Sequence, residues 1–455
     1  MIDRLLKIFT RPEPKLGLVS IPRDQHTISR KDISPNALKV LYRLKNANHQ
    51  AYLVGGCVRD LMLHKKPKDF DVATNATPEE VKHLFKNSRV IGRRFKIVHV
   101  SFGREIIEVT TFRAGHDSAE SQEELHPKHA VAAKSEHGML VRDNVYGTME
   151  EDALRRDFTV NAFYYSVEDF SLKVFNQGIT DIQSKTLRII GNPEIRYRED
   201  PVRMLRAARF AAKLEFELEP QTASKIPALS ELLHNVAPAR LFDETLKLFV
   251  SGHALASFRK LRELGLLKAL LPATEQSLQQ DESGFYTRFI EQALLNTDQR
   301  VLQGKPVTPA FLYAALLWPA TNEQFQQLKN NGTPPSVALH KASQHITGEQ
   351  NKTTAIPKRF SIPMREIWEL QLRLPRKQRA RALAVLEHPR FRAAYDFLLL
   401  REEAGENTEG LGPWWTEFQQ SDPAAQEIIS KKQVPVRKEP GSGRPPRHRR
   451  KRPSF

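Results

Sequence analysis

The sequence is almost without cysteine: Cys57 is the only one among 455 residues. A single cysteine excludes disulfide bonds within the chain and zinc sites built from several cysteines. The sequence also lacks any apolar run close to the roughly 20 residues that span a bilayer, and no secretory signal pattern opens it. These absences predict a cytoplasmic protein without stable membrane insertion.

Acidic residues are few relative to basic ones, with 53 Asp and Glu against 70 Lys and Arg, which gives a net charge of +17. A positive field of this size suits a polyanionic partner, either nucleic acid or an anionic membrane surface. Residues 431–455 alone hold ten basic residues and one acid, Glu439. This segment is rich in proline and glycine and cannot bury a core, so we expect it to be disordered. We interpret it as an arm that binds RNA phosphates rather than as a solubilising tail.

The periodicity of apolar residues predicts an α+β fold, in which a small head with a mixed sheet precedes an all-helical body and a disordered basic tail. Short β-like runs alternate with helical ones through the head, and beyond Asp200 the pattern is almost wholly helical as far as Arg401. The predicted parts are, in order, an N-terminal arm, the head, the neck helices, the body and the tail, at residues 1–33, 34–190, 191–255, 256–405 and 406–455.

Two glycines, Gly55 and Gly56, separate a predicted buried strand from a predicted helix. Without side chains at these positions, a phosphate can approach the backbone N–H groups at the start of the helix. Arg59 falls in the first helical turn, where it can reach the same anion. A Gly-Gly turn between a strand and a helix also occurs for packing reasons alone, so this feature by itself favours nucleotide binding only weakly.

Three acids follow this turn. Asp69 and Asp71 are two residues apart, so that on a strand both side chains point to the same face and repel each other unless a cation lies between them. Glu108 interrupts a strongly β-branched strand, where an acid is costly to bury without a partner. Each acid alone is compatible with a surface carboxylate. Together they predict a site for two Mg²⁺ ions, which activate the attacking hydroxyl and neutralise nucleotide phosphates.

Four short segments resemble the class II nucleotidyltransferase family, which includes bacterial poly(A) polymerases and the enzymes that add CCA to tRNA. They are GGCVRD at residues 55–60, DFD at 69–71, RRDFTVNA at 155–162 and EDPVRMLR at 199–206. The resemblance implies that the head is the nucleotidyltransferase catalytic domain, that the neck recognises the nucleotide and that the body binds RNA. It also implies ATP as substrate and RNA 3′ ends as the acceptor.

The resemblance assigns roles to individual residues of the head. Asp69 and Asp71 would hold the two Mg²⁺ ions, with Glu108 as the third carboxylate. In the third segment, Asp157 would lie near the ribose and take part in catalysis. The residues of that segment expected to contact the incoming nucleotide are Arg156, Asp157 and Asn161.

The fourth segment is expected to begin a helix, because Asp200 suits the N-cap and a proline follows it. Basic residues then recur at helical spacing and form a band along one side. A solvated basic face is the simple interpretation, but the resemblance implies that this helix recognises the base in place of a template. An arginine offers a planar fork of donors for that task. The residues concerned are Asp200, Arg203, Arg206 and Arg209.

A CCA-adding enzyme shares all four segments and is the closest alternative. The aromatic run at residues 163–165, the basic run at 65–68, the helical stretch 356–400 and the basic tail favour the poly(A) polymerase branch. A non-catalytic RNA-binding protein is an alternative of another class, although the three intact acids argue against it. The sequence thus predicts a polynucleotide adenylyltransferase of mRNA processing and RNA decay, with RNA-decay or RNA-chaperone proteins as candidate partners.

Overall fold

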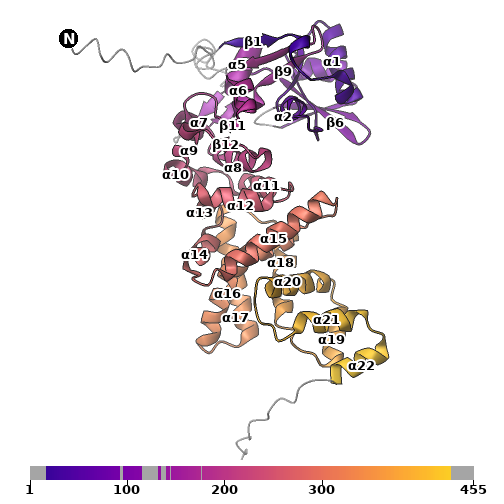
Figure 1. The fold of residues 1–455 in the computed structure, drawn as a ribbon, viewed down its shortest axis with the longest axis vertical. Helices are drawn as coiled ribbons and strands as arrows, with labels where there is room; N and C mark the ends of the chain where they lie inside the picture. The colour runs from indigo at the N-terminus through magenta and orange to yellow at the C-terminus, as the bar shows by residue number, and fades with distance from the viewer. Residues whose placement is uncertain are drawn as a thin grey trace, which may run out of the picture.

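The computed structural model describes residues 17–92, 96–114, 132–134, 140–143, 145–175 and 177–431. Figure 1 shows an elongated molecule, with a sheet-containing head at one end and a stack of helices that extends away from it. This order of a mixed-sheet head and a helical body confirms the predicted α+β class. Among the described residues, no helix combines the length and the apolarity that a membrane crossing requires.

The head is built on an eight-stranded sheet with the strand order β1-β10-β9-β2-β3-β6-β5-β4. Only the β3–β6 pair is parallel, and every other pairing in this sheet is antiparallel. The strands are β1 (Leu18–Ile21), β2 (Ala51–Val54), β3 (Asp71–Thr74), β4 (Ser88–Ile91), β5 (Ile97–Phe102), β6 (Glu105–Thr111), β9 (Phe163–Ser166) and β10 (Leu172–Phe175). Two smaller sheets pair β7 (Ala132–Lys134) with β8 (Leu140–Asp143) and β11 (Thr186–Leu187) with β12 (Glu217–Leu218).

Local capping explains where the helices of the head begin. Helix α1 (Pro35–Asn46) starts after Ser34, whose hydroxyl accepts from the backbone N–H groups of Asn36 and Ala37. Thr77 forms a capping box with Glu80 at the start of α3 (Pro78–Leu84). Among the described residues, the other helices of the head are α2 (Gly56–Met62), α5 (Met149–Arg155) and α6 (Gly178–Gln183), with short 3-10 turns at Arg23–Gln25, Arg30–Asp32 and Thr159–Asn161.

The helices of the neck and body share one continuous apolar core with the head. The neck comprises α7 (Pro193–Glu199), α8 (Val202–Leu214), α9 (Pro220–Ser224), α10 (Ile226–Leu229), a 3-10 turn at Ser230–Asn235, α11 (Pro238–Phe249) and α12 (Ala254–Glu263). The body comprises α13 (Leu267–Leu270), α14 (Pro272–Gln280), α15 (Phe285–Leu302), α16 (Pro309–Asn330), α17 (Pro335–Thr353), α18 (Lys358–Gln371) and α20 (Phe391–Glu403). Helix α8 is buried along most of its length, so it is a central element of the fold.

Both predicted ends of the folded part need correction. The expected tail at 406–455 begins too early, because α21 (Leu411–Gln420) and α22 (Pro423–Lys431) pack with α19 (Arg379–Leu386) around a second apolar core. Trp415 and Phe418, three residues apart on α21, lie in this core together with Phe391 and Tyr395 of α20. Similarly, the second half of the expected N-terminal arm (1–33) supplies edge strand β1 and the buried Ile28. Residues 1–16 and 432–455 lie outside the described residues.

Candidate active site

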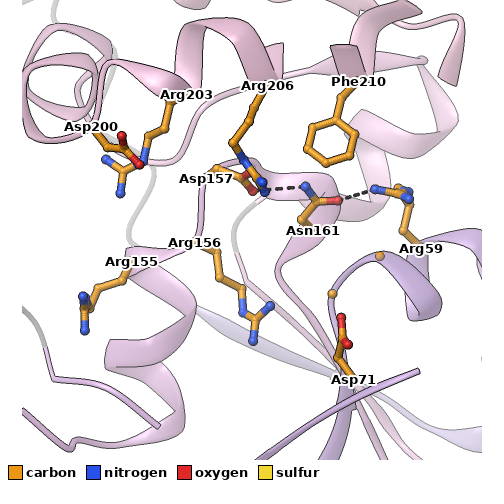
Figure 2. A pocket seen from close by; sticks show the side chains of 12 residues that line it. Arg59, Asp71, Arg155, Arg156, Asp157, Asn161, Asp200, Arg203, Arg206 and Phe210 are labelled. Carbon is orange, nitrogen blue, oxygen red and sulfur yellow. Dashed lines mark hydrogen bonds and ion pairs between the residues drawn. The ribbon is translucent and has the colours of Figure 1, made fainter. Parts of the chain in front are cut away.

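A pocket of about 410 Å³ lies between the sheet of the head and helix α8 of the neck (Figure 2). It is lined by Gly55, Gly56, Arg59, Asp71, Arg155, Arg156, Asp157, Asn161, Asp200, Arg203, Arg206 and Phe210. These residues come from all four segments singled out in the sequence, although the segments are far apart along the chain. Ten of the predicted site residues line the pocket, and three do not: Asp69, Glu108 and Arg209.

The glycine turn brings the backbone close to a side chain of the third segment. Gly55 has φ +73°, a backbone conformation that favours glycine, and a Cβ there would lie 3.1 Å from the Arg156 Nη1 atom. The Gly55 N–H group donates to the Phe163 carbonyl at 3.1 Å, which ties the turn to β9. Helix α2 then begins at Gly56. The turn therefore leaves room for Arg156 at the pocket wall.

A buried chain of polar contacts crosses the pocket at its centre (Figure 2). Arg206 donates from Nε and Nη2 to Asp157 Oδ2 at 2.7 and 2.5 Å. Asn161 Nδ2 donates to Asp157 Oδ1 at 3.0 Å, and the Phe158 N–H group donates to the same oxygen at 2.8 Å. Burial alone would raise the pKa of Asp157, but Arg206, Asn161 and the Phe158 N–H group together lower it to about 2. The carboxylate is therefore ionised and held in one orientation.

Arg59 is directed towards this network. Its Nη1 atom donates to Asn161 Oδ1 at 2.5 Å, and its Nε and Nη2 atoms donate to Asp60 Oδ1 at 2.9 and 2.7 Å. The side chain is 2% exposed. Because these donors already have protein partners, Arg59 orients Asn161 in addition to contributing positive charge to the pocket.

Arg156 is held by two residues of the head. Its Nε atom donates to the Tyr164 hydroxyl at 2.7 Å, and its Nη2 atom lies 3.1 Å from Asp152 Oδ2. The Tyr164 hydroxyl in turn donates to Asp152 Oδ2 at 2.6 Å. Burial lowers the pKa of Arg156, but Tyr164 and Asp152 outweigh that effect and raise it, so the guanidinium is a fixed cation. In Figure 2, Arg156 projects into the pocket on the side of Asp71.

The neck residues of the pocket are also locked by ion pairs. Asp200 Oδ2 accepts from Arg240 Nη2 at 2.7 Å, and Asp200 Oδ1 accepts from the Val202 N–H group at 3.3 Å. Arg203 Nη1 donates to Glu199 Oε2 and to the Arg196 carbonyl, both at 2.8 Å. Arg203 is nearly buried, so its position is fixed before any ligand arrives.

Arg196 joins the neck to the head. Its Nη2 atom donates to the carbonyls of Arg155 and Arg156 at 2.7 and 2.9 Å, while its Nη1 atom donates to Glu199 at 2.6 Å. The same Glu199 accepts from Arg203. One glutamate therefore sets the position of the neck arginines relative to the third segment.

The three predicted metal ligands lie in different settings. Asp71 is the first residue of β3 and is the register partner of Glu108 on the parallel strand β6. Glu108 lies 3.3 Å from the His99 Nε2 atom across the β5–β6 pair. Asp69 is exposed and lies two residues before the first residue of β3, so of these two acids only Asp71 belongs to the strand. Within the described ranges, no three His, Cys, Asp or Glu side chains form a metal-binding group.

The electrostatics at Asp71 nevertheless fit a divalent cation. Burial raises the pKa of Asp71 to about 6, with Glu108 and Asp69 raising it as well and Arg156 opposing them. Negative charge is therefore concentrated at this end of the pocket. Mg²⁺ commonly binds one or two carboxylates and takes its remaining ligands from phosphates and water, so a closed protein cage is not needed.

Sequence reasoning assigned no role to two residues that line the pocket. Arg155 lies beside the predicted Arg156, and burial together with Arg113, Arg196 and Arg203 lowers its pKa to about 9. Phe210 lies one helical turn after Arg206 on α8, and this spacing could have indicated it.

Three guanidinium groups surround the Phe210 ring. Those of Arg59, Arg206 and Arg209 lie 5.4, 5.3 and 4.6 Å from the ring centroid. Arg209 therefore contacts the ring but does not line the pocket.

Three family models match the chain. They are described as the poly A polymerase head domain, the probable RNA and SrmB-binding site of polymerase A, and the polymerase A arginine-rich C-terminus, and they match residues 51–188, 215–278 and 331–454. Together they cover the head, the neck and the C-terminal part of the chain.

The relatives separate the two branches that the sequence left open. Poly(A) polymerase I of Salmonella typhimurium is 50% identical over 409 residues, which cover 89% of this chain and 87% of that protein. The CCA-adding enzyme of Lactobacillus helveticus is 36% identical over 228 residues, 50% of this chain and 53% of that enzyme. The solved CCA-adding enzyme of Bacillus stearothermophilus in complex with CTP has the same fold, with a TM-score of 0.53, 23% identity and coverage of 88% of this chain and 82% of that one. The chain therefore belongs to the poly(A) polymerase I family of nucleotidyltransferases.

Proposed function

We propose that this protein is a template-independent polynucleotide adenylyltransferase, which transfers AMP from ATP to RNA 3′ ends and releases pyrophosphate. The observation that carries the proposal is the pocket, which places the carboxylate of Asp71 opposite a set of fixed arginines. Phosphoryl transfer depends mainly on positioning and on neutralising charge, and it needs no protein nucleophile. The family relationship supports the same activity.

Asp71, with Glu108 beside it and Asp69 just before the strand, would hold the metal. When bound there, two Mg²⁺ ions would neutralise the phosphates and lower the pKa of the attacking hydroxyl. The protein contributes the orientation of these acids. Pairing with β6 fixes Asp71 next to Glu108, and Arg156 lowers the pKa of Asp71, which favours its ionised form.

The arginines of the third segment would bind the nucleotide phosphates. Arg155 and Arg156 line the pocket that Asp71 also lines, and Asp152 and Tyr164 hold Arg156 as a cation. Asp157 and Asn161 present polar atoms that Arg59 and Arg206 orient, so they suit the hydroxyl groups of a ribose.

The neck would select the base. Asp200, Arg203 and Arg206 line the pocket, and each already has a charged partner of its own. A site built from fixed polar groups rejects a base that leaves those groups unpaired. One rigid arrangement therefore favours repeated use of the same nucleotide, which is what poly(A) synthesis requires.

The setting that follows from this activity is cytoplasmic mRNA processing and RNA decay. The neck region that matches the probable RNA-binding site would contact RNA beyond its 3′ end. RNA-decay or RNA-chaperone proteins are the partners that we propose. These proposals rest on the activity and on the family relationship.

The nucleotide requirement tests the proposed function. With an unstructured RNA primer and Mg²⁺, we expect long A-tails from ATP and poor incorporation of CTP, because the base-selecting groups keep one arrangement. The products are resolved by length on a denaturing gel, with ATP alone compared with CTP plus ATP. Addition of a single CCA triplet, confined to tRNA that lacks its 3′ end, would instead identify a CCA-adding enzyme.

The basic tail provides a second test. Truncation after Lys431 keeps α22 and removes residues 432–455. We expect weaker RNA binding and a flatter salt dependence, because each lost contact with a single-stranded phosphate lowers the log–log slope by about 0.7. Turnover at saturating RNA should change little. An unchanged salt slope, measured by RNA binding across a KCl series, would rule out the tail as an RNA-binding arm.

A further inference from the structure

A second pocket, of about 430 Å³, lies outside the nucleotide site. It forms where residues 27–32 pack against the end of α2 and the loop that follows it, and this loop leads directly to Asp69 and Asp71. The residues that line it are Thr27, Ile28, Lys31, Asp32, Leu61, His64, Lys65, Lys66 and Pro67. Four of them are basic or can become so, and Asp32 is the one acid.

The loop that carries the basic residues is anchored at its base. His64 adopts a left-handed backbone conformation (φ +54°), and its N–H group donates to the Leu61 carbonyl at 3.1 Å. The Lys65 N–H group donates to the Asp60 carbonyl at 2.8 Å, and Pro67 is buried. The backbone is thus fixed, while the side chains of His64, Lys65 and Lys66 are exposed.

The basic side chains of this pocket have no ion-pair partner among the described residues. Over the described part of the chain, the side chains of Lys31, His64, Lys65 and Lys66 make no ion pair or hydrogen bond with another residue. A cluster of like charges that is not paired internally is costly for folding and favours binding of an external anion.

The same positive charge continues onto the neck, towards the nucleotide pocket. Besides the effect of burial, the charge of Lys65 lowers the pKa of both Lys213 and His253, so the loop lies close to α8 and to the start of α12. Arg59 and Arg209 lower the pKa of Lys213 as well, whereas Asp60 raises it. The second pocket and the nucleotide pocket share helix α2, which contributes Leu61 to the second pocket and Arg59 to the nucleotide pocket.

We propose that this second pocket binds a backbone phosphate of the RNA primer, close to its 3′ end. The proposal rests on the proposed function, and it names the surface that directs the RNA towards the acids. Lys66 is three residues before Asp69, and three residues of extended chain span at most about 11 Å. A phosphate held by Lys65 and Lys66 is thus near the reacting end of the RNA. ATP has its own pocket, so the second pocket is available to a longer polyanion.

Loss of both lysines tests this assignment. The variant is Lys65→Ala with Lys66→Ala, and the matched control is Lys82→Ala with Lys86→Ala, which removes the same charge from exposed positions of the same domain. Binding of a labelled oligo(A) RNA is measured without ATP across a KCl series. We expect about tenfold weaker binding at low salt and a log–log slope lower by about 1.4 for two lost contacts. The KM for ATP should stay the same.

A primer with one neutral methylphosphonate linkage locates the contact. Neutralising the phosphate that occupies the pocket should weaken binding to the wild-type protein but not to the lysine variant, and this linkage should lie near the 3′ end. The assignment is overturned if the lysine variant behaves like its control. It is also overturned if only distant linkages respond, or if the variant changes only the KM for ATP or the inhibition by pyrophosphate. Because binding is measured without ATP, failure of AMP transfer would count against the proposed function and not against this site.

Discussion

Replacement of Asp71 with asparagine is expected to lower the rate of AMP transfer by a factor on the order of a thousand or more, while the fold stays intact. The factor is typical of removing a group that stabilises charge in a phosphoryl-transfer transition state. The fold should tolerate the change because burial, together with the charges of Glu108 and Asp69, disfavours the ionised Asp71 carboxylate and raises its pKa to about 6. Because the folded state disfavours this charge, its removal should not reduce the free energy of unfolding near neutral pH.

The measurement is single-turnover AMP transfer with saturating ATP, RNA and Mg²⁺, together with a thermal unfolding curve. Asp243→Asn is a suitable control, because it makes the same chemical change at an exposed position of the neck. RNA binding by the Asp71 variant should equal that of the wild type. Wild-type turnover in the variant would contradict the metal assignment, and a large fall in Tm would mean that Asp71 has a structural role.

Arg206→Ala is expected to have the second largest effect, and it should act on both stability and nucleotide binding. The change leaves the buried Asp157 carboxylate without its main partner, which costs about 3 kcal/mol or more. The folded-state pKa of Asp157 is about 2, below its ordinary 3.8, so the ionised carboxylate stabilises the wild-type fold above pH 3.8. This contribution is lost as the pH falls from 3.8 towards 2, and the Arg206 variant should lack most of it.

A double variant separates the two effects of Arg206. Adding Asp157→Asn removes the stranded charge, so Arg206→Ala with Asp157→Asn should regain much of the stability but not the affinity for ATP. Denaturant unfolding and ATP binding are measured on Arg206→Ala, on Asp157→Asn and on the double variant. Arg259→Ala is the control, since its pair with Glu291 is exposed and should contribute about 1 kcal/mol or less. Full recovery of ATP binding in the double variant would show that this pair does not form the nucleotide site.

Turns and helix starts could be predicted from the sequence, because they depend mainly on residues that are neighbours along the chain. The glycine turn before α2 and the helix in the fourth segment depend on neighbouring residues, and both formed in the segments where the sequence predicted them, although α8 begins at Val202, one residue after the predicted start. The four segments also met in one pocket. The spacing of apolar residues, which changes from a mixture of strand and helix periods to a helix period along the chain, was enough to predict a mixed-sheet head and a helical body.

Other features depended on contacts between distant residues, which no local pattern contains. The neighbour of Asp71 is Glu108, because β3 pairs in parallel with β6, and strand register is decided by the whole sheet. Arg59 orients Asn161, and Arg206 holds Asp157, across 102 and 49 residues of sequence. Likewise, Trp415 of α21 packs against Phe391 of α20, and its indole N–H group donates to the Leu374 carbonyl, 41 residues away in sequence. The sequence by itself therefore determined which four segments meet at the pocket, and only the tertiary structure decided which of their residues line it and which partners hold them, because burial and ion pairing arise between segments that folding brings together.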